Sequence, residues 1–397
     1  MVNPRLESID TFIRRLLTIR RRLARLPQPQ FSGDWPNGFP PSESLSTILH
    51  ASYYASLEQY EGRTIRTVLN WTHPAFGRAY VHRFDSPSVD FSAKNMRQLA
   101  QVADGMSSNL SLVLDNDRLA ISGIEFCWPV GGALRNDGFV PGVKISIKGP
   151  GHIEYQEGTL AVAYNKGRQI RLRPLQQNEA IRAWIADTEC ALHEQAISSL
   201  KSDAVWGPHE ERPEFPNGVM LTFLCSAIRT IENGGHGGTI LVLPTAHDAK
   251  CIDVRFPALS NDLTTLVRRF GEASLLAAKE GFSTTSPLSP SMVSEHDMMS
   301  TLEAFGVAFA KLANCDGAIV MTRDARLLGF GGIIQSPAPA LCRTQPRQAR
   351  GARHTSAQWL CESVPNSIAL VVSADRGITL IHSLERNTQI TKDLVVW

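Results

Sequence analysis

Between residues 294 and 334 a helix-like pattern of apolar residues runs directly into two strand-like patterns, and this order restricts the fold more than any other feature of the sequence. Apolar residues recur at alternating steps of four and three, as on one buried helix face, at Met298, Leu302, Phe305, Phe309 and Leu312. Ser294 and Asp297 predict a capping box at the start of this helix. The segments 318–323 and 327–334 predict a hairpin with glycines in its second strand.

Further helices and strands are predicted in the C-terminal half, both before and after residues 294–334. Further strands are predicted at about 239–243, 251–256, 367–373 and 378–382, and further helices at 219–232, 260–279 and 355–362. Helices interspersed with strands in this way predict an α/β (α+β) fold, in which a mixed β-sheet is covered by helices.

The N-terminal half predicts a smaller α+β module. Its expected elements are helices at 5–26, 42–60 and 176–200, and strands at 64–71, 110–114, 119–124, 143–147, 152–155 and 160–164. The chain of 397 residues exceeds the usual size of one domain, and prolines and charges cluster between Trp206 and Pro216. We therefore expect an N-terminal domain at 1–205, a linker at 206–217 and a C-terminal domain at 218–397.

The composition argues against several classes of protein. A net charge of +2 is not that of a globally basic nucleic-acid binder, so nucleic acid is not an expected partner. No apolar run approaches the ~20 residues that a bilayer span needs, so no transmembrane segment is expected. The first residues lack the uninterrupted apolar core of a secretory signal. Seven cysteines without Cys-x-x-Cys spacing predict neither a disulfide framework nor a zinc site, and together these features predict a cytoplasmic protein.

Two short stretches carry groups that are suited to catalysis. Asp316-Gly317-Ala318 stands where the predicted helix ends and the strand begins, so the carboxylate is expected to project from the rim of the sheet. Arg353 and His354 precede a predicted short helix, and the free N–H groups and dipole of a helix start attract anions. An acid, an arginine, a histidine and a helix start together suggest a site for nucleotide phosphate and a metal ion.

A glycine-rich loop, Gly234-Gly235-His236-Gly237-Gly238, precedes the first predicted strand of the C-terminal half. It is not a P-loop, because no Gly-Lys-Ser/Thr follows and because the loop leads into a strand. Its glycines still allow the backbone to approach a ligand closely.

These residues resemble the diadenylate cyclases, a family marked by an Asp-Gly-Ala motif and, some tens of residues later, by an Arg-His-Arg motif in a Gly-Thr-Arg-His-Arg setting. Here the second stretch reads Gly351-Ala352-Arg353-His354-Thr355, so Thr355 stands where the family has its second arginine. Glu362 falls where the family has a glutamate on the following helix. The stretch 371–377 is similar to a Val-Ser-Glu-Glu-Thr-Gly turn of the family.

The resemblance implies an enzyme that condenses two ATP molecules into cyclic di-AMP and pyrophosphate, with Mn²⁺ or Mg²⁺. It implies that Asp316 helps to activate the ribose 3′-hydroxyl, that Arg353 and His354 handle phosphates, and that Asp316 and His354 bind the metal. The expected nucleotide-binding residues are Gly317, Ala318, Gly351, Thr355, Ser356 and Glu362. Because the two transfers are equivalent, two such domains are expected to face each other in a homo-oligomer.

The N-terminal half resembles the sensor domain that accompanies one branch of this family, through the stretch Lys148-Gly149-Pro150-Gly151-His152. The sequence names no ligand or partner for this domain.

Two alternatives to an active diadenylate cyclase stay open. Thr355 makes the first credible, because threonine has neither the charge nor the bidentate reach of arginine, and the second stays open because the sequence does not identify the residues that contact the base. One alternative is a nucleotide-binding sensor with a decayed active site, and the other is a cyclase that uses other nucleotides. The loop before the Arg-His pair carries Arg343, Arg347 and Arg350, and we expect Arg350 to supply the missing charge because it lies nearest in sequence.

Overall fold

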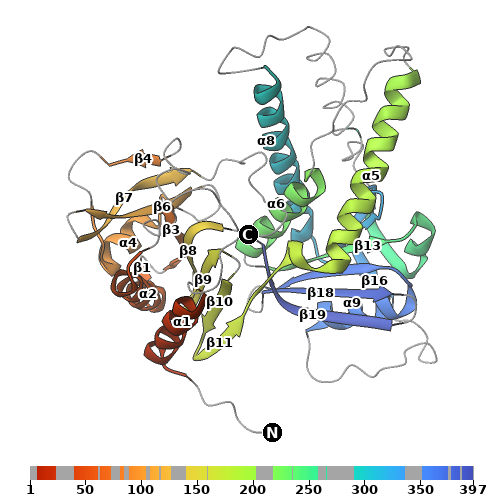
Figure 1. Cartoon of the computed structure of the whole chain (residues 1–397). Helices are drawn as coiled ribbons and strands as arrows, with labels where there is room; N and C mark the ends of the chain where they lie inside the picture. The colour runs from red at the N-terminus through yellow and green to blue at the C-terminus, as the bar shows by residue number, and fades with distance from the viewer. Residues whose placement is uncertain are drawn as a thin grey trace. The chain divides into compact units, whose positions relative to one another are not determined.

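The structure is a computed structural model that divides into two compact units, with the boundary between Leu172 and Arg173 (Figure 1). The residues that it describes are 7–23, 40–60, 63–72, 81–84, 89–103, 108–115, 118–126, 140–158, 160–202, 218–234, 236–257, 265, 290–335, 351–373, 377–384 and 387–396. The expected linker at 206–217, the expected helix at 260–279 apart from residue 265, and the loop with Arg343, Arg347 and Arg350 lie outside the described residues.

The described part of unit 1 contains a nine-stranded sheet with strand order β11-β10-β9-β8-β3-β6-β7-β4, and β5 pairs with β7. Its strands are β3 (Thr67–Thr72), β4 (Val81–Arg83), β5 (Val89–Asp90), β6 (Ser108–Asp115), β7 (Arg118–Phe126), β8 (Val140–Gly149), β9 (His152–Gly158), β10 (Leu160–Asn165) and β11 (Arg168–Arg171). A separate short pair joins β1 (Gln59–Tyr60) to β2 (Arg63–Thr64). The helices are α1 (Ile9–Leu23), α2 (Ser42–Leu57) and α4 (Ala93–Leu99).

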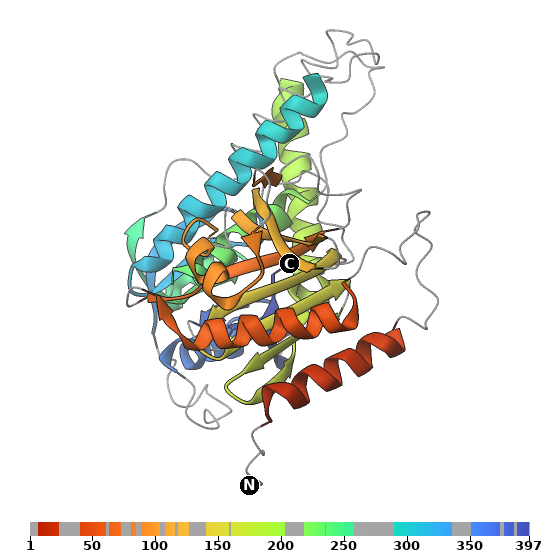
Figure 2. The same cartoon turned by 90° about the vertical axis from the view of Figure 1, so that its left-hand side faces the viewer.

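Helices α1 and α2 run across the same face of this sheet (Figure 2). The buried residues of α1 are Ile9, Phe12, Ile13 and Leu16, whose spacing of three and four forms one apolar stripe. They share a core with alternate residues of the central strands, including Leu69, Ile145 and Tyr155. The apolar stripe of α1 therefore packs on the apolar face of the strands, and unit 1 has a layer of helices on one sheet.

A half-buried ion pair fixes the basic end of α1 to the sheet. Arg20 Nε donates to both carboxylate oxygens of Glu157 on β9, at 2.8 and 3.0 Å. Arg20 Nη1 donates to the Pro40 carbonyl oxygen at 2.8 Å, and Tyr155 donates its hydroxyl to the same carboxylate. Since one guanidinium joins α1, β9 and the start of α2, this arginine belongs to the packing of unit 1.

Unit 2 contains, in its described part, an eight-stranded sheet with strand order β12-β19-β18-β17-β13-β15-β16-β14. Its strands are β12 (Arg173–Pro174), β13 (Gly238–Leu243), β14 (Ile252–Pro257), β15 (Ala318–Thr322), β16 (Leu327–Ile334), β17 (Ile368–Ser373), β18 (Gly377–Leu384) and β19 (Asn387–Val395). β13 with β15 and β12 with β19 pair in parallel, and the other neighbours are antiparallel. This mixed sheet, with its covering helices, confirms the predicted α+β fold class.

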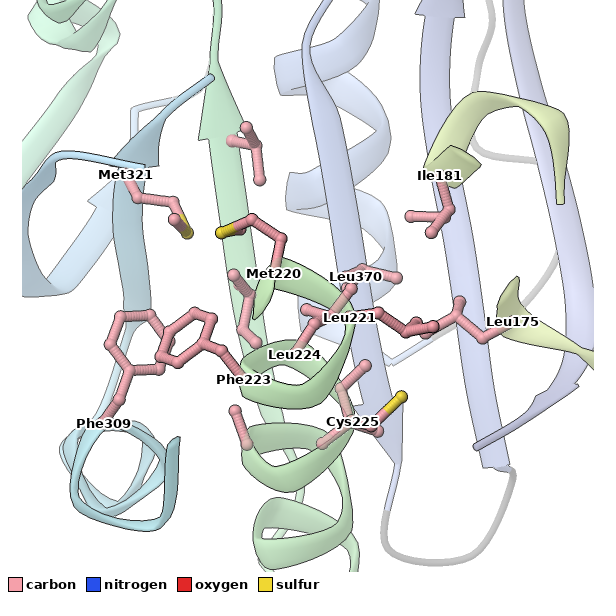
Figure 3. Packing of buried hydrophobic residues seen from close by; sticks show 14 of the residues in the cluster. Leu175, Ile181, Met220, Leu221, Phe223, Leu224, Cys225, Phe309, Met321 and Leu370 are labelled. Carbon is pink, nitrogen blue, oxygen red and sulfur yellow. The ribbon is translucent and has the colours of Figure 1, made fainter. Parts of the chain in front are cut away.

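Helices cover both faces of the sheet in unit 2. On one face, α5 (Glu179–Ser202), α6 (Val219–Asn233) and α8 (Pro290–Lys311) form a core with β13, β15 and β17, in which Phe223 and Phe309 pack edge to face (Figure 3). Gly306 lets α8 approach α6, because a Cβ there would lie 2.8 Å from the Phe223 carbonyl oxygen. On the other face, α9 (Ala352–Ser363) covers β13, β17 and β18 through Ala357, Leu360 and Cys361.

Helix α5 packs into the core of unit 2, whereas the sequence analysis assigned residues 1–205 to the N-terminal domain. Trp184 and Leu192 are buried in the unit 2 core. Trp184 Nε1 and Thr188 Oγ1 donate to the Arg323 carbonyl oxygen, at 3.3 and 2.5 Å, in the turn between β15 and β16. The boundary falls earlier because α5 places its apolar face against α6 and the sheet, a contact that local periodicity does not specify.

Other details also differ from the predictions made from the sequence. The expected capping box at Ser294 is wrong, because α8 begins at Pro290, a residue that suits the first turn of a helix. The helix expected at 355–362 begins three residues earlier, at Ala352, so Arg353 and His354 lie within its first turn. The strand β19 was missed, because most of its residues are polar and only its end is buried.

The division at Leu172 predicts which fragment of the C-terminal half is stable. Residues 173–397 retain α5 and should unfold cooperatively, whereas residues 217–397 lose Trp184 and Leu192 from the core. Removal of one large core side chain lowers the free energy of unfolding by about 3–5 kcal/mol, so the shorter fragment should be less stable by at least that amount. Urea denaturation followed by circular dichroism measures the difference. Equal stability of the two fragments would contradict the assignment of α5 to unit 2.

Candidate functional site

Two parallel strands begin side by side at one edge of the unit 2 sheet. The register that pairs Ile240 with Ile319 puts the glycine loop before β13 next to Asp316-Gly317 before β15. On the other side of β13, β17 ends and β18 begins at the same edge, since Val372 pairs with Gly238 and Ser373 with Gly377. Four strand ends therefore meet at this edge, which we call the Asp316 edge.

Residue 317 must be glycine because its backbone lies very close to the backbone of β16. Its φ is +120°, and a Cβ at this position would lie 2.5 Å from the carbonyl carbon of Gly331 on β16. No side chain fits into that space, so the residue after Asp316 must be glycine. Ala318 follows as the first, buried residue of β15, and Asp316 itself is exposed to solvent.

The first turn of α9 reaches the same edge from the covered face of the sheet. Gly351 is the N-cap of α9, and Arg353 Nη1 donates to the His236 carbonyl oxygen at 2.7 Å. His354 Nε2 lies 3.3 Å from the hydroxyl oxygen of Thr379 on β18. Arg353 therefore joins the helix start to the glycine loop, and His354 joins it to the second strand beyond β13.

The remaining predicted residues lie along α9. Ser356 Oγ donates to the Ala352 and Arg353 carbonyl oxygens, at 3.0 and 3.2 Å, so this hydroxyl bonds to its own helix. Thr355 is half-buried in the first turn. Glu362 lies near the other end of α9, about 14 Å along the helix axis from Arg353, and its carboxylate accepts a 2.8 Å hydrogen bond from Gln358. The structure thus gathers Asp316, Arg353 and His354 at one edge and holds Glu362 away from it.

One residue at this edge carried no signal in the sequence. Thr239 on β13 is buried, and its hydroxyl oxygen has no hydrogen-bond partner among the described residues. Cross-strand pairing aligns Thr239 with Val371 on β17 and Val371 with Thr379 on β18, so both threonines lie on the face that α9 covers. Threonine is common in strands for its branched shape, which is why the sequence did not single it out.

Two buried cysteines of unit 2 are not nucleophiles of low pKa. Burial raises the pKa of Cys361, on α9, to about 12. Burial also raises the pKa of Cys225, on α6, to about 11. Both thiols therefore stay protonated near neutral pH.

Comparison with known families identifies part of unit 1. Residues 36–125 match the family described as "Probable sensor domain DACNV", which is the N-terminal sensor domain of diadenylate cyclases. This stretch includes α2 and the strands β3, β6 and most of β7, and the match does not extend into unit 2. Part of the chain is therefore similar to a sensor domain, as expected for the N-terminal half, but the stretch 148–152 that suggested the resemblance lies outside the match.

Other comparisons are distant. No curated protein matches the chain. The crystal structure of a hypothetical membrane spanning protein from Bacillus cereus shares 15% sequence identity with it, and the match covers 53% of this chain and 95% of that chain with a TM-score of 0.24. Among the described helices of the present chain, none is long and apolar enough to cross a membrane.

Because Gly317 contacts the Gly331 backbone, one added methyl group at Gly317 should destabilise the protein strongly. Gly317→Ala should lower the free energy of unfolding by roughly 3 kcal/mol, because the Cβ would overlap with backbone atoms of Gly331 and because alanine is strained at the positive φ of this residue. Gly351→Ala is the matched control, since a Cβ there meets nothing within 4 Å and the N-cap φ is −55°. Chemical denaturation of both variants measures the difference. A Gly317→Ala protein as stable as Gly351→Ala would refute the tight contact.

Proposed function

We propose that unit 2 binds ATP at the Asp316 edge and condenses two ATP molecules into cyclic di-AMP, with unit 1 as its sensor domain. The observation that carries this proposal is the meeting of the Asp316 strand start with the first turn of α9, fixed by the 2.7 Å bond from Arg353 to the His236 carbonyl oxygen. The match of residues 36–125 to a sensor domain of diadenylate cyclases adds support from an independent part of the chain.

The proposed reaction uses the three groups in different roles. The 3′-hydroxyl of one ATP attacks the α-phosphorus of the other, a P–O bond forms, the bond to the β-phosphate breaks, and pyrophosphate leaves. The exposed Asp316 carboxylate takes the hydroxyl proton. Arg353 uses one of its five N–H donors for the bond to the His236 carbonyl oxygen, so other donors of the same guanidinium can bond to phosphate oxygens. A second, equivalent transfer closes the ring.

The donor set at this edge fits a divalent metal that is shared with the substrate. Among the described residues there is no group of three or more His, Cys, Asp or Glu side chains that could hold a metal alone. Mg²⁺ usually binds through one or two carboxylates, substrate phosphates and water, so Asp316, with His354 as a second candidate, suits a site completed by ATP. A bound Mn²⁺ or Mg²⁺ would offset negative charge on the transferring phosphate.

A nucleotide-binding sensor without turnover is the second candidate function. The observation in its favour is Thr355, a half-buried residue of the first turn of α9 that carries no charge. An arginine that stabilises transition-state charge in phosphoryl transfer is worth ~10³ in rate or more, so a site with Arg353 alone could bind nucleotide and turn it over very slowly.

Replacement of the acid tests the proposed chemistry. Asp316→Asn should preserve folding and ATP binding and lower cyclic di-AMP formation by about two orders of magnitude or more, because the amide cannot accept the hydroxyl proton. Asp324→Asn, in the turn at the opposite edge of the sheet, is the control and should keep full activity. Chromatography of reactions with each NTP and Mn²⁺ or Mg²⁺ measures the products. ATP binding without any product would favour the sensor, and undiminished product from Asp316→Asn would reject the role of the acid.

The proposed reaction also requires two copies of unit 2. Each site holds one ATP, so the two α-phosphates meet only when two such domains face each other. We therefore expect activity per molecule to fall when the protein is diluted below its dimerisation constant. Rate measurements over a dilution series, combined with light scattering, follow this effect. A constant rate per molecule from a demonstrated monomer would rule the arrangement out.

A further inference from the structure

Two aromatic rings stack at the outer edge of the unit 2 sheet. Phe256 on β14 and Phe330 on β16 are cross-strand partners, with ring centroids 4.9 Å apart and planes inclined by 21°. Phe330 is partly buried against the core, but Phe256 is 44% exposed. One face of the Phe256 ring lies against Phe330, and nearly half of the residue is still exposed.

Two glycines connect this ring pair to the Asp316 edge. A Cβ at Gly331 would lie 3.0 and 3.3 Å from two carbons of the Phe256 ring, so the ring rests against bare backbone. The same Gly331 backbone touches Gly317, where a Cβ would lie 2.5 Å from it. The order across the strands is therefore Asp316-Gly317, then Gly331, then Phe256. Neither glycine has a side chain that could separate the acid from the aromatic ring.

A flat, exposed aromatic surface on β14, two strands away from the strand that follows Asp316, suits a specific class of ligand group. Every nucleobase has a π-face that stacks on aromatic side chains, and offset stacking adds to the burial of apolar area. An aliphatic ligand group would gain only from burial, and a phosphate would gain nothing from the ring. The π-face of Phe256 and its place beside Gly331 therefore favour a base.

We propose that Phe256, supported from behind by Phe330, stacks on the nucleobase of a nucleotide whose sugar and phosphates lie at the Asp316 edge. This inference rests on the proposed nucleotide site and assigns the position of the base within it. Stacking is tolerant of base identity, so Phe256 contributes to the binding of ATP and GTP alike. Discrimination between bases must then come from polar groups elsewhere in the site.

A comparison of the affinities for a nucleotide and for its phosphate chain alone tests the role of Phe256. Isothermal titration of the full-length chain compares ATP with inorganic tripolyphosphate, which lacks a base. Phe256→Leu keeps apolar bulk against Gly331 and removes the π-face, and it should weaken ATP binding about fivefold or more while leaving tripolyphosphate binding unchanged. Phe256→Tyr keeps the ring and should bind ATP within about twofold of wild type. Leu384→Ala, which removes another exposed apolar side chain at the far end of β18, is the control and should change neither affinity.

Each remaining outcome counts against the inference in a different way. Unchanged ATP affinity in Phe256→Leu overturns the stacking role while the nucleotide site stands. A parallel loss of ATP and tripolyphosphate binding overturns it as well, because the ring would then act through the structure of the edge. A change in oligomeric state without a change in affinity, measured by sedimentation, assigns the exposed ring to a contact between copies. If wild type binds neither ligand, both the proposed function and this inference fail.

Discussion

The parallel pairing of β13 with β15 is the constraint on which the arrangement of unit 2 depends. Both strands are buried along their full length, so each is covered on both faces and neither can shift its register without exposing apolar residues. Parallel neighbours begin at the same edge, and this alone brings the glycine loop beside Asp316. The antiparallel partner β17 then ends there and β18 begins there, so the edge collects polar groups from segments far apart in sequence.

Backbone contacts at glycines hold this edge in place. Gly317 touches Gly331, and a Cβ at Gly329 would lie 2.3 Å from the Phe256 carbonyl oxygen. Such contacts between backbones leave little freedom for the strand starts, since no side chain lies between them to adjust. This support suits the role proposed for Asp316, because an acid that accepts a proton from a hydroxyl must be held in position before the ligand arrives. The bond from Arg353 to His236 extends the same rigidity to the first turn of α9.

Unit 1 has its own hydrophobic core, separate from that of unit 2. Buried residues of α1 and α2 pack on one face of its sheet, and Arg20 joins α1 to β9 through Glu157. Buried charge also occurs within the β8–β9 hairpin. Burial by itself would raise the pKa of Glu154, but Lys148, His152 and Lys144 outweigh it and lower that pKa to about 2. The carboxylate therefore stays ionised at any physiological pH, and it does not act as a pH sensor in this range.

The sequence by itself determined many of the elements, because periodicity and turn residues act over a few neighbours. It gave the α+β class, the strand that starts after Asp316 and a helix start beside Arg353 and His354. Tertiary structure alone decided that β13 and β15 are parallel neighbours, that α5 joins unit 2, and that Thr239, Thr379 and the His236 carbonyl oxygen come to the same edge. These outcomes depend on pairing and packing between segments up to about 200 residues apart, whose energies arise only when distant apolar faces meet.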